Sequence, residues 1–169
     1  MYIFAQIIGG IGIRIWVLSV LKKEKTKILI YQGVANIFLA AEFLLLHVYT
    51  PASMDIATSI RSFVFSCYTK KNKSIPIVWL FIFLCITIFF GIFTWTGFLG
   101  LIPVINTAMY VVTSWLKDTK WLRIFYVVAA LFWIYYNFNV GAYAIIIGNI
   151  FEVITGTYAV IKYNKNGGK

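Results

Sequence analysis

Positive charge lies in four clusters along this chain, and each cluster follows every second hydrophobic run. The turns between these clusters, around residues 49–51, 94–97 and 137–139, carry no Lys or Arg. In a protein that crosses the bilayer repeatedly, cytoplasmic loops hold Lys and Arg whereas translocated loops do not. The alternation therefore predicts a membrane protein in which every second turn is cytoplasmic. Thirteen of the fifteen basic residues belong to the clusters: Lys22, Lys23, Lys25, Lys27; Lys70, Lys71, Lys73; Lys117, Lys120, Arg123; Lys162, Lys165, Lys169.

The composition favours the lipid bilayer over nucleic acid as the partner of this charge. The chain is 62% hydrophobic, with a mean hydropathy of +0.88, which is far more apolar than a usual soluble domain. A net charge of +10 would suggest nucleic acid if the basic residues shared one exposed face. The basic residues instead lie in short stretches between apolar runs, so we expect no nucleic-acid partner. Cys67 and Cys85 lie in apolar stretches without metal-ligand spacing, and no metal or cofactor is expected.

The apolar runs between helix breakers predict seven crossings. With the basic turns inside, the N-terminus lies outside and the C-terminus is cytoplasmic, which requires an odd number of crossings. The first run precedes the first Lys cluster, so it is expected to be an uncleaved helix and not a signal peptide. The predicted segments are approximately 2–21, 28–48, 52–69, 75–93, 98–116, 121–137 and 140–161.

The fourth predicted segment differs from the other six. Between Ile77 and Phe93 it has no charge and no amide, and Thr87 is its only hydroxyl. A helix this uniformly apolar faces lipid over most of its circumference. We therefore predict an all-α fold with a 3+1+3 parallel repeat. Its parts are a first three-helix unit over 1–73, a connector helix over 74–95 and a second three-helix unit over 96–169.

Five ionisable residues fall inside predicted spans, where charges are costly and mark a cavity, an ion pair or a transport path. Arg61 and Glu152 are nearest the middle of their segments, and we expect them to form a gating or ion pair. Asp55 is a further candidate for this gating or ion-pair role; the alternative is that it lies close enough to a segment end to reach the interface. Glu42 could hydrogen-bond a neighbouring helix for structural reasons alone. Arg14 follows the Gly9–Gly12 stretch and joins the gating or ion-pair candidates.

Polar residues recur at helical spacing on three segments, which places them on shared faces. We predict a polar cavity in which Asn149, Ser59 and Asn106 bind a solute; the alternative is that the stripes only pack helices. Pro103 is expected to kink its helix and to serve as a hinge. The three lines are Asp55, Ser59, Ser62, Ser66; then Asn106, Tyr110, Thr113; then Asn149, Glu152, Gly156.

No enzyme constellation stands out in the sequence. The single histidine, His47, lies beside Tyr49 at the predicted outer interface. Neither a second His nor a paired-Cys motif nor a nucleophile elbow accompanies it. We therefore predict that the protein is not an enzyme.

Three strings of residues resemble the YgjV-type family of bacterial inner membrane proteins. They are 6–9 (QIIG), 60–65 (IRSFVF) and 101–107 (LIPVINT) running on to 115–118 (WLKD). The resemblance covers nearly the whole chain and implies a multi-pass protein of the bacterial inner membrane. The layout is also similar to the SWEET and PQ-loop transporter group, whose path runs between the triplets and whose third and seventh helices present asparagines to the solute. Asn149 matches this pattern, and Ser59 stands at the corresponding place on the third segment.

These observations lead to one functional expectation and one alternative. We expect a transporter that passes a small polar solute by alternating access between two three-helix units. The alternative is a non-transporting membrane protein: a scaffold, an assembly partner or a small-molecule sensor. Association into a homo-oligomer is open in either case.

Overall fold

Seven α-helices and one short 3-10 turn make up the computed structural model, which describes residues 1–95, 97–117 and 119–165. Thr96, Asp118 and Lys169, which belong to patterns noted above, lie outside the described residues. The described part contains no strand, so the all-α prediction is confirmed. The elements are α1 (Tyr2–Val20), α2 (Lys25–Leu45), α3 (Tyr49–Lys70), α4 (Ile77–Phe93), η1 (Phe98–Gly100), α5 (Leu101–Trp115), α6 (Thr119–Val140) and α7 (Tyr143–Lys165).

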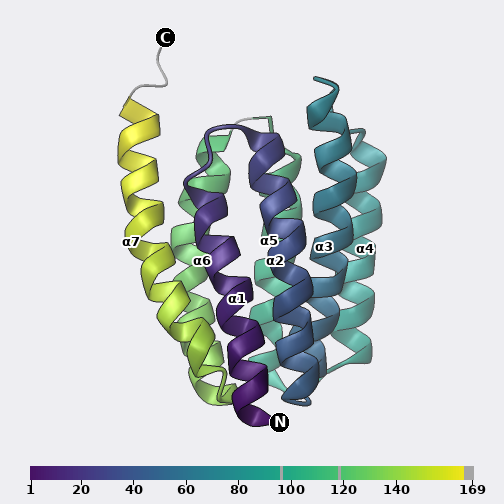
Figure 1. Ribbon diagram of the computed structural model, residues 1–169. Coiled ribbons are helices and arrows are strands. Elements are labelled where there is room, and N and C mark those ends of the chain that lie inside the picture. Colours follow the sequence, from purple (N-terminus) through teal and green to yellow (C-terminus); the bar gives the residue numbers. More distant parts are fainter. Residues whose placement is uncertain (96, 118, 166–169) are drawn as a thin grey trace.

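Five of these helices are long and apolar enough to cross a membrane: α1, α2, η1 with α5, α6 and α7. The helix α4 is apolar but has only 17 residues. The helix α3 has 22 residues but is more polar, since it carries Asp55, Arg61 and several hydroxyls. Both run alongside the other five within the same bundle (Figure 1).

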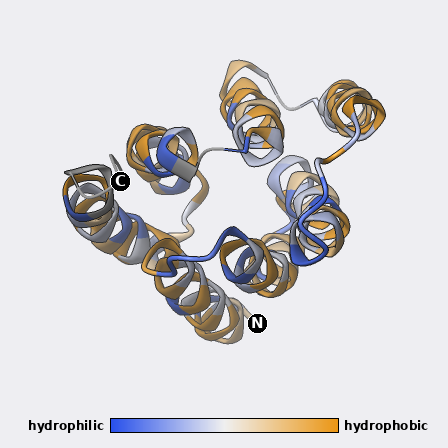
Figure 2. Cartoon of the chain, turned by 90° about the horizontal axis from the view of Figure 1, so that it is seen from above, coloured by the Kyte–Doolittle hydropathy of each residue, from blue (hydrophilic) through white to orange (hydrophobic). Residues whose placement is uncertain are grey.

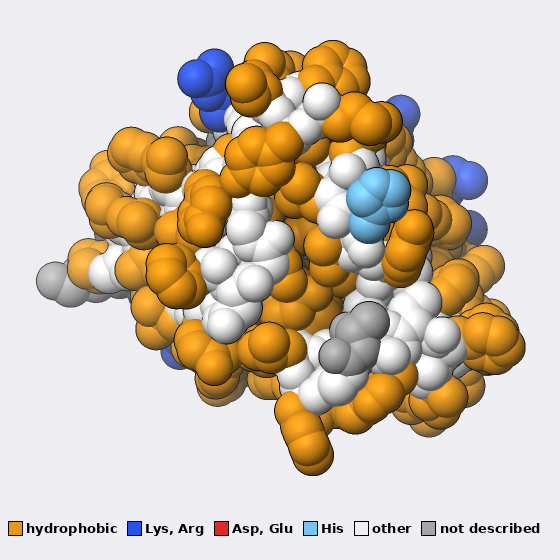
Figure 3. Space-filling model, turned by 90° about the horizontal axis from the view of Figure 1, so that it is seen from below, with side chains coloured by type: hydrophobic (Ala, Val, Ile, Leu, Met, Phe, Trp, Pro, Cys, Tyr) orange, Lys and Arg blue, Asp and Glu red, His pale blue; other side chains and the backbone are white. Residues whose placement is uncertain are grey.

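The basic turns gather at one end of the bundle. The α1–α2, α3–α4 and α5–α6 turns lie together at the top of Figure 1, and we call this the basic end. The start of α1 and the other three turns form the opposite end, which we call the N-terminal end. In the view of that face, Lys and Arg appear only at the margin (Figure 3). The alternation of charge along the sequence is thus an alternation between the two ends of the bundle.

Six helices form a ring, and α4 stands outside it. The helix α1 packs against α2 and α7, α2 against α3, α3 against α5, α5 against α6, and α6 against α7 (Figure 2). The connector α4 contacts α3 and α5 on the outer side of the ring. The six helices therefore follow one another around the ring in the order of the sequence. We call α1–α3 the first arc and α5–α7 the second arc.

Two predicted turns are displaced by a few residues. The α2–α3 turn spans residues 46–48, and Pro51 lies in the first turn of α3, where its missing N–H removes no helical hydrogen bond. The helix α6 continues through Asn137 and Asn139 and ends at Val140. Gly141 follows with φ +75, the left-handed conformation that commonly terminates a helix.

Pro103 lies near the start of its helix. It is the third residue of α5, and the 3-10 turn η1 comes directly before that helix. The change in helix geometry therefore precedes Pro103, and the proline removes no hydrogen bond from the middle of a span. Its use as a hinge stays a prediction.

Close packing between α1 and α7 depends on one glycine. A Cβ at Gly148 would overlap the side chain of Ile13 and would lie 2.8 Å from the Ile13 Cβ, which cannot move without its helix. We expect Gly148→Ala to lower the free energy of unfolding by about 1–3 kcal/mol, the usual cost of overfilling a packed core. Thermal unfolding in detergent would measure this loss.

Gly10, on the same helix as Ile13, supplies the matched control. A Cβ at Gly10 would meet no atom within 4 Å, so Gly10→Ala should keep the stability or raise it slightly. Equal losses of stability in the two variants would show that α1 and α7 do not pack as described.

Candidate functional site

A small cavity lies inside the ring, and all six ring helices contribute to its wall. Its volume is about 40 Å³, which by the usual size criterion is room for a few water molecules at most. The first arc contributes the polar side chains Asn36, Asp55 and Thr58, and the second contributes Thr107, Tyr110, Asn149 and Glu152. Polar side chains from α1–α3 and from α5–α7 thus face the same small space.

The two ends of this cavity are closed by aromatic side chains. Towards the basic end, Trp16 and Tyr110 line the cavity and pack edge to face, with ring centroids 5.7 Å apart. Tyr126 adds a third ring, 5.5 Å from Tyr110. Towards the N-terminal end, Phe43 and Trp133 stack with centroids 6.4 Å apart. Each layer joins residues of both arcs, so opening either end requires the arcs to separate.

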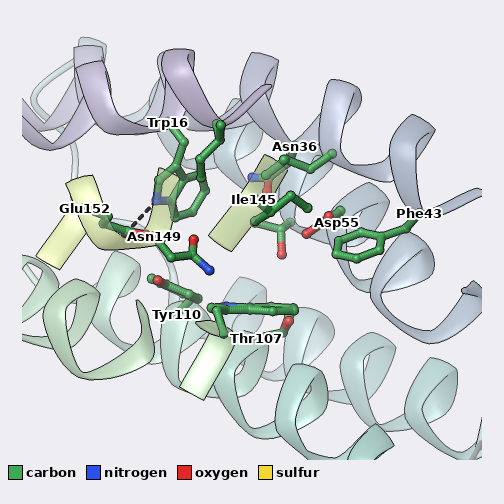
Figure 4. A pocket seen from close by; sticks show the side chains of 13 residues that line it. Trp16, Asn36, Phe43, Asp55, Thr107, Tyr110, Ile145, Asn149 and Glu152 are labelled. Carbon is green, nitrogen blue, oxygen red and sulfur yellow. Dashed lines mark hydrogen bonds between the residues drawn. The ribbon is translucent and has the colours of Figure 1, made fainter. Parts of the chain in front are cut away.

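Glu152 and Asp55 lie at opposite ends of the cavity (Figure 4). The Glu152 carboxylate accepts a hydrogen bond of 2.6 Å from the Trp16 indole Nε1–H. Asp55 lies beside Phe43 at the other end, and its Oδ2 has no hydrogen-bond donor among the described residues. Asn149 projects into the space between them, and its Nδ2 also has no partner there. The cavity therefore presents carboxylate acceptors at both ends and an amide between them.

Arg61 is buried close to this site but does not line it. Its side chain is 1% exposed, and none of its three guanidinium nitrogens has a hydrogen-bond partner in the described part of the chain. No ion pair joins Arg61 to Glu152 among those residues. Tyr110, which lines the cavity, interacts electrostatically with Arg61, Glu152 and Asp55.

Glu42 occupies a separate buried place between α1 and α2. Its side chain is 0% exposed, and a Cβ on Gly9 would overlap its carboxylate. The absence of a side chain at Gly9 therefore makes room for Glu42 against the α1 backbone. Glu42 does not line the cavity, although it interacts electrostatically with Asp55.

Hydrogen bonds tie the two arcs together at the N-terminal end. The Gln6 Oε1 accepts from the Ala144 backbone N–H at 2.8 Å, and the Gln6 Nε2 donates to the Gly141 carbonyl at 3.4 Å. The Tyr2 hydroxyl donates to the same carbonyl at 3.0 Å. One turn of α1 thus holds the α6–α7 turn.

A second set of ties closes the basic end. The Lys25 ammonium donates to the Leu116 carbonyl, and the Arg123 guanidinium donates to the Lys22 carbonyl at 3.4 Å. These bonds join the α1–α2 turn to residues around the α5–α6 turn. The cavity thus has an aromatic layer and a set of hydrogen bonds between the arcs towards each end, and Asp55, Asn149 and Glu152 in its wall are buried.

The predicted site residues divide into three groups. Asn149, Asp55 and Glu152 line the cavity. Ser59 and Asn106 are buried but do not line the cavity. The Ser59 hydroxyl donates to the Gly33 carbonyl at 2.8 Å. Thr107, the residue after Asn106, lines the cavity instead. Arg14 is exposed on the outer surface of the bundle, away from the site.

Neither the ionisable groups nor the three polar lines in the sequence pointed to Asn36, which lines the cavity, or to its buried neighbour Gln32. Asn36 and Gln32 are buried one turn apart on α2, and the Asn36 Nδ2 donates to the backbone carbonyl of Gln32 at 2.8 Å. The Gln32 Nε2 donates to the Tyr126 hydroxyl. Two amides at i and i+4 in an apolar run were a readable signal. Trp16 carried a weaker signal, because one aromatic side chain in a span is commonplace.

The remaining reactive side chains do not gather into a site. In the described residues, no group of three or more His, Cys, Asp or Glu could hold a metal ion. Cys67 and Cys85 are free and exposed on the outer surface. His47 is exposed at the N-terminal end, with its Nδ1 3.4 Å from the Tyr49 hydroxyl.

Comparison with known families gives one match. The sequence model of the family Imp-YgjV, described as a bacterial inner membrane protein, matches residues 3–167. No curated protein and no solved structure matches the chain.

Proposed function

This chain belongs to the Imp-YgjV family of bacterial inner membrane proteins, and we propose that it moves a small polar solute across that membrane by alternating access. The observation that carries the proposal is the buried polar cavity, whose wall is shared by α1–α3 and α5–α7. Solute sites between structural repeats near the bilayer midplane are typical of secondary transporters. The likeness in layout to the SWEET and PQ-loop group belongs to this same proposal.

The topology under this proposal has seven crossings. The helices α3 and α4 run beside the five apolar spans, so a bilayer that contains the five also contains these two (Figure 1). The start of α1 and the end of α7 lie at opposite ends of the bundle, as an odd number of crossings requires. The positive-inside rule then puts the basic end in the cytoplasm and the N-terminus outside.

The lining suggests the chemistry of the solute. Asp55 and Glu152 offer carboxylate acceptors at the two ends of the cavity, and none of the described residues that line it is cationic. A solute that donates hydrogen bonds, or carries positive charge, matches these groups. Asn149 between them can both donate and accept. We therefore favour a small donor-rich or cationic solute.

Transport requires the enclosed state to open one end at a time. Outward opening would break the Gln6 ties and separate Phe43 from Trp133, while the Lys25 tie holds the basic end. Inward opening would do the reverse, separating Trp16 from Tyr110. Glu152 and Arg61 both interact electrostatically with Tyr110, and under this proposal a shift of the arcs brings them into an ion pair in one open state.

One observation favours the non-transporting alternative. Pockets for organic ligands have volumes of about 300–1,000 Å³, whereas this cavity has about 40 Å³. The bond from Ser59 to the Gly33 carbonyl also serves helix packing. If the enclosed state never opens, the protein is a scaffold or an assembly partner with a polar core.

Access to Asn149 separates the two functions without knowledge of the solute. Asn149 is 2% exposed in the enclosed state. We expect Asn149→Cys, in a background with Cys67 and Cys85 replaced by Ala, to react with a membrane-impermeant thiol reagent from both sides. Right-side-out and inside-out vesicles would present the two sides. Alternating access requires both reactions, since each open state exposes the cavity to one side.

Three exposed positions calibrate this labelling. Tyr49→Cys at the N-terminal end should react only from outside, and Lys23→Cys at the basic end only from inside. Phe81→Cys, on the outer surface of α4, should stay unlabelled because lipid covers it. An Asn149→Cys variant as silent as Phe81→Cys in both vesicle types would overturn the transport proposal and leave the scaffold.

A further inference from the structure

A groove runs along the outer surface of the bundle between α1 and α7. Its volume is about 520 Å³, well within the range of sites that hold organic ligands. Gly10, Arg14 and Leu18 line one side at successive turns of α1, and Ala144, Ile147 and Phe151 line the other side on α7. Small residues form part of its wall, and a Cβ at Gly10 would meet nothing within 4 Å.

Among the described residues that line this groove, Arg14 is the only charged one. It is exposed on a helix that otherwise presents apolar side chains to its surroundings, and in the described part of the chain no hydrogen bond or ion pair engages it. A cation on the lipid-facing side of a membrane span is costly unless it meets an anion or reaches the interface. The lipids themselves supply such an anion at the headgroup level.

The depth of Arg14 fits a lipid phosphate. Arg14 lies six residues before the end of α1 at Val20, which is about 9 Å along a helix. An arginine side chain at this depth extends towards the nearer interface, here the basic end. Its planar guanidinium can hold a phosphate through two parallel hydrogen bonds. Anionic phospholipids are enriched in the leaflet that faces such basic ends.

We propose that the α1–α7 groove binds one anionic phospholipid, with an acyl chain between the two helices and its phosphate on Arg14. The apolar wall formed by Leu18, Ile147 and Phe151 matches an acyl chain, and the one charge matches the headgroup. This inference does not rest on transport. It bears on the central cavity, however, because Ile13 lines both the groove and the cavity.

Native mass spectrometry of the purified full-length protein tests this site. The probes are dioleoyl phosphatidylglycerol and dioleoyl phosphatidylcholine, which share their acyl chains and differ in net charge. We expect the wild type to retain one phosphatidylglycerol per chain in preference to phosphatidylcholine. Arg14→Leu should weaken this retention about tenfold, a modest value for the loss of one charge-assisted contact.

Two further variants keep the test decisive. Gly10→Leu fills the groove but leaves Arg14 in place, so it should weaken retention of both lipids. Lys71→Ala removes a basic residue of the α3–α4 turn, outside the groove, and should leave retention unchanged. Unchanged retention in Arg14→Leu, or an equal loss in Lys71→Ala, would overturn the proposal. A dimer that Arg14→Leu converts to a monomer would also overturn it and assign the groove to a second copy of the chain.

Discussion

Replacing Glu152 by Ala is expected to lower both the thermal stability and the solute flux of this protein, whereas Glu152→Gln should lower only the flux. The Glu152 carboxylate accepts the hydrogen bond of the Trp16 indole at 2.6 Å, and both side chains are buried. In Glu152→Ala the indole N–H loses its acceptor, which costs about 1–3 kcal/mol. In Glu152→Gln the amide oxygen can accept the same bond, so the stability should stay close to that of the wild type.

The flux of both variants should fall about tenfold or more, which corresponds to a loss of about 1.4 kcal/mol in the stabilisation of the translocating state. A glutamine directs an NH₂ donor at the cavity where the wild type offers an acceptor, and a donor-rich solute then meets the wrong partner. The measurement is uptake into proteoliposomes of the metabolite that most raises the thermal stability of the wild type in a ligand panel.

An exposed glutamate provides the control for this pair of variants. Glu24 lies in the α1–α2 turn and forms an ion pair with Lys27 at 2.8 Å. Glu24→Gln should change neither stability nor flux, because exposed ion pairs contribute little. Wild-type flux in Glu152→Gln would contradict the proposed role and reduce Glu152 to a residue that positions Trp16.

The number and direction of the helices could be predicted because charge and apolarity alternate with the turns. The first three basic clusters mark the three turns at the basic end, Lys162 lies in the last turns of α7, and each apolar run is one helix. The order of the helices around the ring was harder, since every span presents similar apolar side chains to its neighbours. Contact between α1 and α7 depends on the fit of Gly148 to Ile13, which no periodicity reveals.

Helical spacing predicts which residues share a face but not what that face meets. Asp55 and Ser59 lie one turn apart on the same stripe of α3, yet Asp55 lines the cavity while Ser59 bonds to the Gly33 carbonyl of α2. The sequence therefore indicated the polar stripe, and the packing of α2 against α3 decided which members reach the cavity.

Arg61→Met is expected to raise the stability of the protein and to reduce its solute flux about tenfold or more. A tenfold lower flux corresponds to a transport barrier that is higher by about 1.4 kcal/mol. Arg61 is 1% exposed, and its guanidinium nitrogens have no hydrogen-bond partner among the described residues. Burial of a charge without such partners costs several kcal/mol. Methionine keeps an unbranched apolar stem that can fill the space, so the free energy of unfolding should rise by about 1–4 kcal/mol.

A protein would keep so costly a cation only if its function needs the charge. Under the transport proposal, Arg61 supplies the positive charge that pairs with Glu152 when the two arcs move. Arg61→Lys keeps that charge and should therefore retain more flux than Arg61→Met. Because its buried charge remains, Arg61→Lys should also be less stable than Arg61→Met. Thermal unfolding and proteoliposome uptake on the same preparations would compare the three proteins. A clear loss of stability in Arg61→Met would instead show that Arg61 holds the fold together, because an interaction that stabilises the native state would then have been removed.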